Sequence, residues 1–145
     1  DYVLIVGGSG PMLDYYKKSA VKTGLSDKVI FTGQLKQEEI VPYILAADLC
    51  LVYYRNEPVN LHRASMKLRE YLALGANVAA NAVGEIKDFK SVVRLSGASY
   101  KAFAAKLKNV LKTKLVNNAG GKKYIKSRYD WHVEAKKLSE WINNL

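Results

Sequence analysis

The stretch "SMKLREYLALGANVAA" (residues 65–80) contains a helix and a strand separated by a glycine. Leu68 and Leu72 are four residues apart and therefore share one helix face, and Gly75 is a typical helix terminator. The apolar run that follows indicates a short buried strand. A helix that leads directly into an apolar strand is typical of α/β domains built on a parallel sheet.

The alternation of strands and helices continues on both sides of this stretch. A polar loop is predicted at 55–64, and the chain beyond Ser99 is predicted to be helical. Apolar strands are predicted at 2–6, 28–33, 48–54, 77–83 and 91–95, and helices at 12–23, 36–47 (interrupted near Pro42), 63–75 and 84–89. The fold class is therefore α/β, with one Rossmann-like domain over residues 1–145 whose parallel sheet carries helices on both faces.

Two apolar stripes with helical spacing mark the last third of the chain as a helical extension. The first stripe consists of Phe103, Leu107, Val110 and Leu111. The second lies on a final helix at 130–145 and consists of Trp131, Ala135, Leu138, Ile142 and Leu145.

Composition is that of a soluble globular protein, and the single cysteine suits a cytoplasmic location. Of the 145 residues, 49% are hydrophobic and 25% are charged. No apolar run approaches the roughly 20 residues of a membrane span, and the start shows no signal-peptide pattern. The single cysteine, Cys50, lies in an apolar strand-like run and is predicted to be buried, and a lone cysteine excludes an internal disulfide.

The net charge of +10 resides in the last 60 residues. Residues 1–85 hold nine basic and nine acidic groups, whereas residues 86–145 hold fourteen basic and four acidic groups. This asymmetry favours an anionic partner, either phospholipid headgroups or nucleic acid. The alternative is a solvated lysine face on helices. Because the charge is accompanied by no motif of nucleic-acid recognition, no nucleic-acid partner is expected.

Lys67 stands near the start of the helix at 63–75, where a cation opposes the helix dipole. Either solvent screens it there, or an anion joins it. The alternative to an anion site is a surface ion pair between Lys67 and Glu70, which are three residues apart on one helix face.

In a parallel sheet, ligands bind outside the carboxyl ends of the strands, and the loops at 7–11, 33–35 and 55–64 qualify. The first, "GGSGP", contains Gly8, Ser9 and Gly10, but Leu13 stands where a dinucleotide fingerprint needs its third glycine. It is not a P-loop either. The loop either brings backbone close to a ligand or forms a plain tight turn.

The order of four motifs resembles a known family. "LIVGGSGP", "VIFTGQL", "AADLCLVYY" and "SMKLREYLALGANVAA" together are similar to the carboxyl-terminal domain of GT-B fold glycosyltransferases, closest to the retaining, nucleotide-sugar-dependent family 4. The resemblance extends to "YDWHVEAKKLSEWINNL" at the end of the chain. It implies the donor-binding half of an enzyme that transfers a sugar from a nucleoside diphosphate to a glycan or lipid-linked acceptor, at the cytoplasmic membrane face.

The resemblance also assigns roles around the helix at 63–75. Glu70 would accept hydrogen bonds from the ribose hydroxyls, while Ser65, Met66, Lys67 and the helix amides would hold the diphosphate. These groups would oppose the charge on the leaving group without a metal, so no cofactor is expected. The two histidines and one cysteine form no metal-ligand cluster in the sequence.

The remaining candidates contact other parts of the donor. Gln34 and Leu35 match the loop that reads the nucleotide base in the family. His62 stands where the family usually has its first glutamate, and it would contact a donor hydroxyl or phosphate. Glu57 is the nearest carboxylate.

Two expectations concern the whole protein. The chain begins with what resembles the second strand of the domain, so an acceptor domain is expected upstream in a longer protein, and the last helix is expected to cross back to it. Because His62 replaces a glutamate, a non-catalytic nucleotide-sugar-binding module or partner subunit is the alternative.

Overall fold

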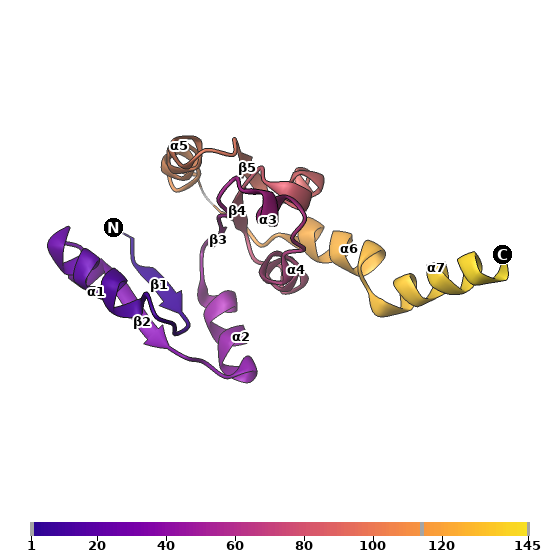
Figure 1. Ribbon diagram of the computed structural model, residues 1–145, viewed down its shortest axis with the longest axis horizontal. Coiled ribbons are helices and arrows are strands. Elements are labelled where there is room, and N and C mark those ends of the chain that lie inside the picture. Colours follow the sequence, from indigo (N-terminus) through magenta and orange to yellow (C-terminus); the bar gives the residue numbers. More distant parts are fainter. Residues whose placement is uncertain (1, 114, 145) are drawn as a thin grey trace. The chain divides into compact units, whose positions relative to one another are not determined.

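The computed structural model describes residues 2–113 and 115–144 and divides the chain into two compact units, Asp1–Tyr43 and Ile44–Leu145 (Figure 1). Each unit contains parallel strands and helices, which confirms the α/β class. The strands form two sheets, in the orders β1-β2 and β3-β4-β5, rather than the one sheet expected. That the whole chain forms one donor-binding domain stays a prediction.

The first unit is built on a parallel pair of strands that runs from the Leu4–Val29 pair to the Gly7–Gly33 pair. Its elements are β1 (Leu4–Gly7), α1 (Leu13–Lys22), the 3-10 helix η1 (Ser26–Lys28), β2 (Val29–Gly33) and the start of α2 (Gln37–Ala46).

Two expectations about the first unit are wrong. Leu4 and Ile5 of β1 are each 46% exposed, although a buried strand was expected. One ten-residue helix and a short 3-10 turn offer too little apolar surface to cover both faces of this sheet. Helix α2 continues through Pro42, where an interruption was expected, because a proline removes one helical hydrogen bond without necessarily ending the helix.

The second unit has the sheet β3-β4-β5 at its core. All four residues of the central strand β4 are buried. The elements of this unit, in chain order, are β3 (Cys50–Val52), α3 (Pro58–Leu61), α4 (Met66–Ala73), β4 (Val78–Asn81), the 3-10 helix η2 (Gly84–Phe89), β5 (Arg94–Ser96), α5 (Tyr100–Val110), α6 (Ala119–Arg128) and α7 (Trp131–Asn143).

The segment at 55–64, expected to be a polar loop, contains the short helix α3. Pro58 occupies its first turn, directly after the N-cap residue Glu57. Proline has a backbone φ close to the helical value and lacks the N–H that would be unpaired there, so it favours the start of a helix. The loop prediction is therefore wrong over these four residues.

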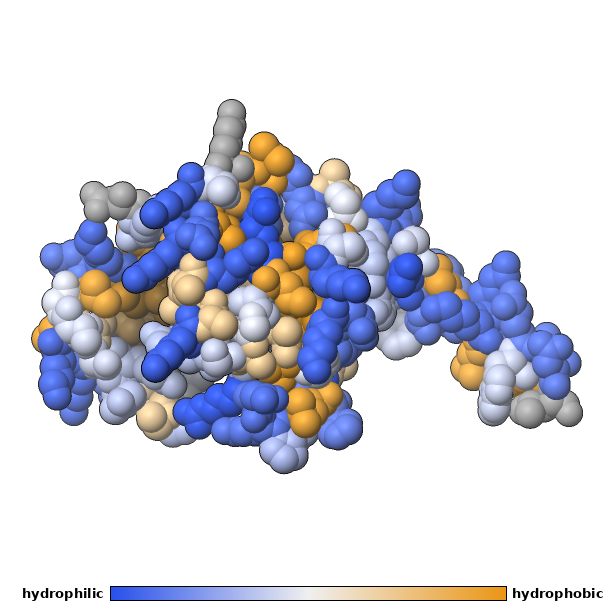
Figure 2. All heavy atoms as spheres, turned by 90° about the horizontal axis from the view of Figure 1, so that it is seen from above, coloured by the Kyte–Doolittle hydropathy of each residue, from blue (hydrophilic) through white to orange (hydrophobic). Residues whose placement is uncertain are grey.

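The two C-terminal stripes differ in burial. Phe103 and Val110 of α5 are buried, as expected. In contrast, α7 has no buried residue, and Trp131 and Ile142 of its stripe are exposed. Figure 2 shows hydrophobic and hydrophilic surface side by side on this protruding helix. Leu145 lies outside the described residues.

A close contact between α4 and α6 depends on Gly121. A Cβ atom at Gly121 would lie 2.8 Å from Leu72 Cδ2 and 2.8 Å from Asn118 Nδ2, whereas one at Gly120 would be 3.8 Å from the nearest atom, Asn118 Oδ1. Gly121→Ala is expected to lower the free energy of unfolding by about 1–3 kcal/mol through overpacking. Gly120→Ala, in the same helix, should leave it unchanged or raise it by up to about 1 kcal/mol. Urea denaturation measures both, and equal effects would contradict the packing account.

Candidate donor-binding site

The start of helix α4 is fixed by a buried serine. Ser65 is fully buried and is the N-cap residue, and its Oγ accepts hydrogen bonds from Leu68 N at 3.3 Å and from the Tyr54 hydroxyl at 3.0 Å. The helix begins at Met66, three residues later than expected. In this structure the Oγ of Ser65 caps the helix. That Ser65 also holds a diphosphate stays a prediction.

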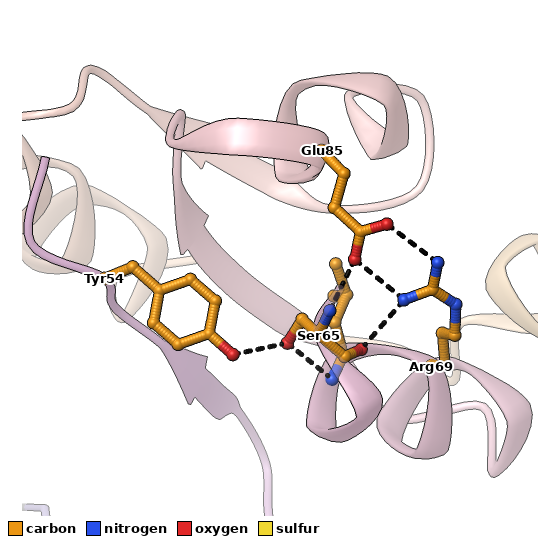
Figure 3. Close-up of polar contacts among 5 residues, drawn as sticks. Tyr54, Ser65, Arg69 and Glu85 are labelled. Carbon is orange, nitrogen blue, oxygen red and sulfur yellow. Dashed lines mark hydrogen bonds and ion pairs between the residues drawn. The ribbon is translucent and has the colours of Figure 1, made fainter. Parts of the chain in front are cut away.

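An ion pair joins α4 to the 3-10 helix η2 at this end (Figure 3). Arg69 Nη1 and Nη2 lie 2.7 Å from Glu85 Oε1 and Oε2, respectively. Glu85 Oε1 also accepts a hydrogen bond from the amide of Ser65. Partial burial acts to raise the pKa of Glu85, but the hydrogen bonds from Arg69 and Ser65 and the charge of Arg69 outweigh it and lower this pKa. Both groups are therefore ionised at neutral pH.

Aromatic rings hold the arginine in place. The Arg69 guanidinium carbon lies 4.7 Å from the ring centroid of Tyr129 and 5.7 Å from that of Phe89. These two rings stack on each other at 5.4 Å. The guanidinium thus contacts aromatic rings as well as the Glu85 carboxylate.

A buried asparagine ties Tyr54 to the carboxyl ends of the strands. Asn81 Oδ1 accepts a hydrogen bond from Tyr54 N at 2.9 Å, and Asn81 Nδ2 donates to Tyr54 O at 2.7 Å and to Ala98 O at 3.0 Å. Asn81 is the last residue of β4 and is fully buried. Asn81 was not among the predicted site residues, although a polar residue at the end of an apolar strand is a usable signal.

Two backbone amides at the α4 N-terminus are left open. The amides of Ser65, Leu68 and Arg69 bond to Glu85, to Ser65 Oγ and to Ser65 O, respectively. The amides of Met66 and Lys67 donate no hydrogen bond to any acceptor within residues 2–113 and 115–144. The α4 terminus therefore presents two adjacent unpaired N–H groups, which suit an anion.

Lys67 and Glu70 are the second and fifth residues of α4, and their side chains form no ion pair with each other. Lys67 is exposed and Glu70 is half-buried. Within the described part of the chain, neither side chain has a recorded hydrogen bond or ion pair. The surface ion pair considered as the alternative does not form, and both charged groups remain available to a ligand.

Glu57 and His62 stand at opposite ends of α3. Glu57 is its N-cap, with Oε1 3.8 Å from Arg55 Nη1, and His62 is its C-cap. Both side chains are exposed. No hydrogen bond or ion pair among the described residues joins either of them to Lys67 or Glu70. Their contact with a donor sugar stays a prediction.

In the first unit, the loops after β1 and β2 meet. Ser9 Oγ donates a hydrogen bond to Gln34 Oε1 at 2.8 Å, and Gly8 N donates to Gly33 O at 2.8 Å. Gly8 and Gly10 have φ values of 130° and 154°, which other residues rarely adopt. The structure thus brings the loop at Gly8 and Ser9 against the loop at Gly33 and Gln34, and Leu35 directly follows Gln34 in the sequence.

The chain matches one protein family over most of its length. The profile of the family described as "Glycosyl transferases group 1" matches residues 1–137 of the chain. The chain belongs to this family. No curated protein matches the chain in sequence.

Solved structures agree with membership of the group 1 glycosyl transferases. Sucrose-phosphate synthase from Thermosynechococcus elongatus matches with a TM-score of 0.77 at 21% identity, over 97% of this chain and 38% of that one. HepE of Anabaena in complex with UDP matches with a TM-score of 0.71 at 19% identity, over 99% of this chain and 41% of that one. WaaG, a glycosyltransferase involved in lipopolysaccharide biosynthesis, matches with a TM-score of 0.69 at 19% identity, over 97% of this chain and 38% of that one.

These matches confirm the resemblance to the carboxyl-terminal half of a GT-B glycosyltransferase. The chain spans 38–41% of the length of these structures. At such identities the likeness establishes the fold.

Three further observations concern sites outside α4. Burial raises the pKa of the Cys50 thiol to about 11, so this cysteine stays protonated, as its predicted burial implies. Among residues 2–113 and 115–144, no group of three His, Cys, Asp or Glu side chains is placed to hold a metal ion. Their helices also include none with the length and apolarity needed to cross a membrane.

Proposed function

We propose that this group 1 glycosyl transferase chain binds a nucleoside-diphosphate sugar as the donor-binding half of a retaining glycosyltransferase. The observation that carries the proposal is the start of α4, where the open amides of Met66 and Lys67, the Lys67 ammonium and Glu70 lie within about one helical turn. HepE, a structural match, is solved with UDP and with UDP-glucose, which supports the same ligand class.

The proposed chemistry follows from these groups. The diphosphate accepts hydrogen bonds from the two amides and interacts with the Lys67 ammonium. The two carboxylate oxygens of Glu70 accept hydrogen bonds from the ribose hydroxyls. As the bond from the sugar to the diphosphate breaks, negative charge grows on the leaving group, and the fixed amides and Lys67 stabilise it. This arrangement requires no metal ion.

Other candidates are considered within their own units. For the first unit taken by itself, we propose that the joined loops, with Gln34, Leu35 and the backbone of Gly8–Gly10, suit contact with a nucleotide base. His62 and Glu57, at the ends of α3, would meet the donated sugar. Because His62 stands where the family usually has a glutamate, a non-catalytic nucleotide-sugar-binding module is the second candidate function.

The acceptor is proposed to be a glycan or lipid-linked molecule at the cytoplasmic membrane face. The concentration of basic groups at 86–145 supports this. Lysines of α5 and α6 at positions 101, 108, 122, 123 and 126 are exposed, and an anionic surface would attract them. The acceptor is expected to bind mainly to a further domain of a longer protein.

Calorimetry with UDP, GDP and ADP in the presence of EDTA tests donor binding. At least one of them is expected to bind this chain weakly without a metal, because the site offers cationic and amide donors rather than a carboxylate pair that would hold a cation. Binding that appears only after Mg²⁺ or Mn²⁺ is added would contradict the proposal.

A further inference from the structure

The Glu85 carboxylate of the Arg69–Glu85 ion pair lies at the N-terminal end of α4, where the proposed function places a diphosphate. Glu85 Oε1 accepts the hydrogen bond of the Ser65 amide (Figure 3). The next two amides along the chain, those of Met66 and Lys67, are the open ones. Successive amides at a helix start lie close together. An uncompensated carboxylate at this point would therefore repel an incoming diphosphate.

Arg69 offsets this negative charge. Its two terminal nitrogens each lie 2.7 Å from one Glu85 oxygen, so the pair is bidentate and carries no net charge. The side chains of both residues are largely shielded, with 19% and 23% of their surface exposed. The ring of Tyr129 against the guanidinium limits the freedom of Arg69 to leave the carboxylate.

We propose that Arg69 is a positioning residue for donor binding, which neutralises Glu85 so that this carboxylate can anchor the Ser65 amide without repelling the diphosphate. The inference rests on the proposed function. It assigns Arg69 an electrostatic role beyond the mechanical link between α4 and η2. A purely mechanical link would affect every ligand alike, whereas an electrostatic role depends on the charge of the ligand.

Calorimetry in EDTA with UDP and with uridine separates these roles across four variants. Arg69→Met retains an apolar stem against Phe89 and Tyr129 and is expected to weaken UDP binding roughly tenfold while leaving uridine binding unchanged. Arg69→Lys retains the charge and should stay within about threefold of the unchanged chain. Arg69→Met combined with Glu85→Gln should recover UDP affinity, because the repelling charge is gone.

Glu85→Gln alone provides a second measurement that does not depend on whether Arg69→Met folds. The glutamine oxygen can still accept the Ser65 amide, and Arg69 is then uncompensated, so UDP affinity is expected to rise several-fold. Added salt should reduce these differences.

The outcomes distinguish the inference from the function on which it rests. If the unchanged chain fails to bind UDP, the proposed function is overturned and the inference falls with it. If the unchanged chain binds UDP but Arg69→Met weakens uridine as much as UDP, or Glu85→Gln fails to strengthen UDP binding, the inference alone is overturned.

Discussion

Lys67→Ala is expected to weaken the binding of UDP and of pyrophosphate by roughly 10- to 150-fold and to leave uridine binding nearly unchanged. The range corresponds to the loss of a charge-assisted hydrogen bond, about 1.5–3 kcal/mol in a desolvated site. Lys67 is the cation beside the open amides and has no recorded partner among the described residues that would compete for it. Calorimetry with the three ligands measures the separation.

Glu70→Gln is expected to do the reverse, weakening uridine binding while leaving pyrophosphate binding nearly unchanged, because its carboxylate is assigned to the ribose. Lys101→Ala is the matched control. Lys101 is the second residue of α5, which Ser99 caps as Ser65 caps α4, but Ala104 stands where α4 has Glu70. Equal small effects of Lys67→Ala, Glu70→Gln and Lys101→Ala would assign Lys67 and Glu70 to ordinary helix surface.

The 145-residue chain by itself is expected to show no measurable sugar transfer, and at most slow hydrolysis of the donor. Transfer requires the acceptor nucleophile to be held against the anomeric carbon, and such positioning can supply roughly 7–11 kcal/mol of barrier reduction. A longer protein that includes an acceptor domain should transfer the sugar, and Glu70→Ala in that protein should abolish most of the activity. Chromatographic product analysis with a labelled donor measures both.

Two results would contradict this expectation in different ways. Robust transfer by the 145-residue chain alone would exclude a catalytic cleft shared with a second domain. A longer protein that binds the donor but never consumes it would favour the non-catalytic binding module.

Features governed by local patterns could be predicted from the sequence. The spacing of Leu68 and Leu72 placed both on the buried face of α4, and both are fully buried. Gly75 follows the helix with a φ of 77°, a backbone conformation that favours glycine. Each of these depends on residues within a few positions of one another.

Contacts between distant residues could not be predicted in this way. Glu85 is 16 positions from Arg69, and Asn81 is 27 positions from Tyr54, so no periodic pattern connects either pair. The predictions of burial for β1 and α7 were wrong for a similar reason. The apolar residues of β1 and α7 have the spacing of buried elements, but whether another surface covers them depends on packing that one segment does not encode.

The most direct test of the central claim is a titration of the isotope-labelled chain with UDP in EDTA, followed through the backbone amide signals in NMR. The account predicts that the amides of Met66 and Lys67 shift strongly and saturably with UDP and with pyrophosphate but not with uridine, while the amides of Tyr100 and Lys101 at the start of α5 stay unchanged. UDP binding that leaves the Met66 and Lys67 amides unmoved would contradict it.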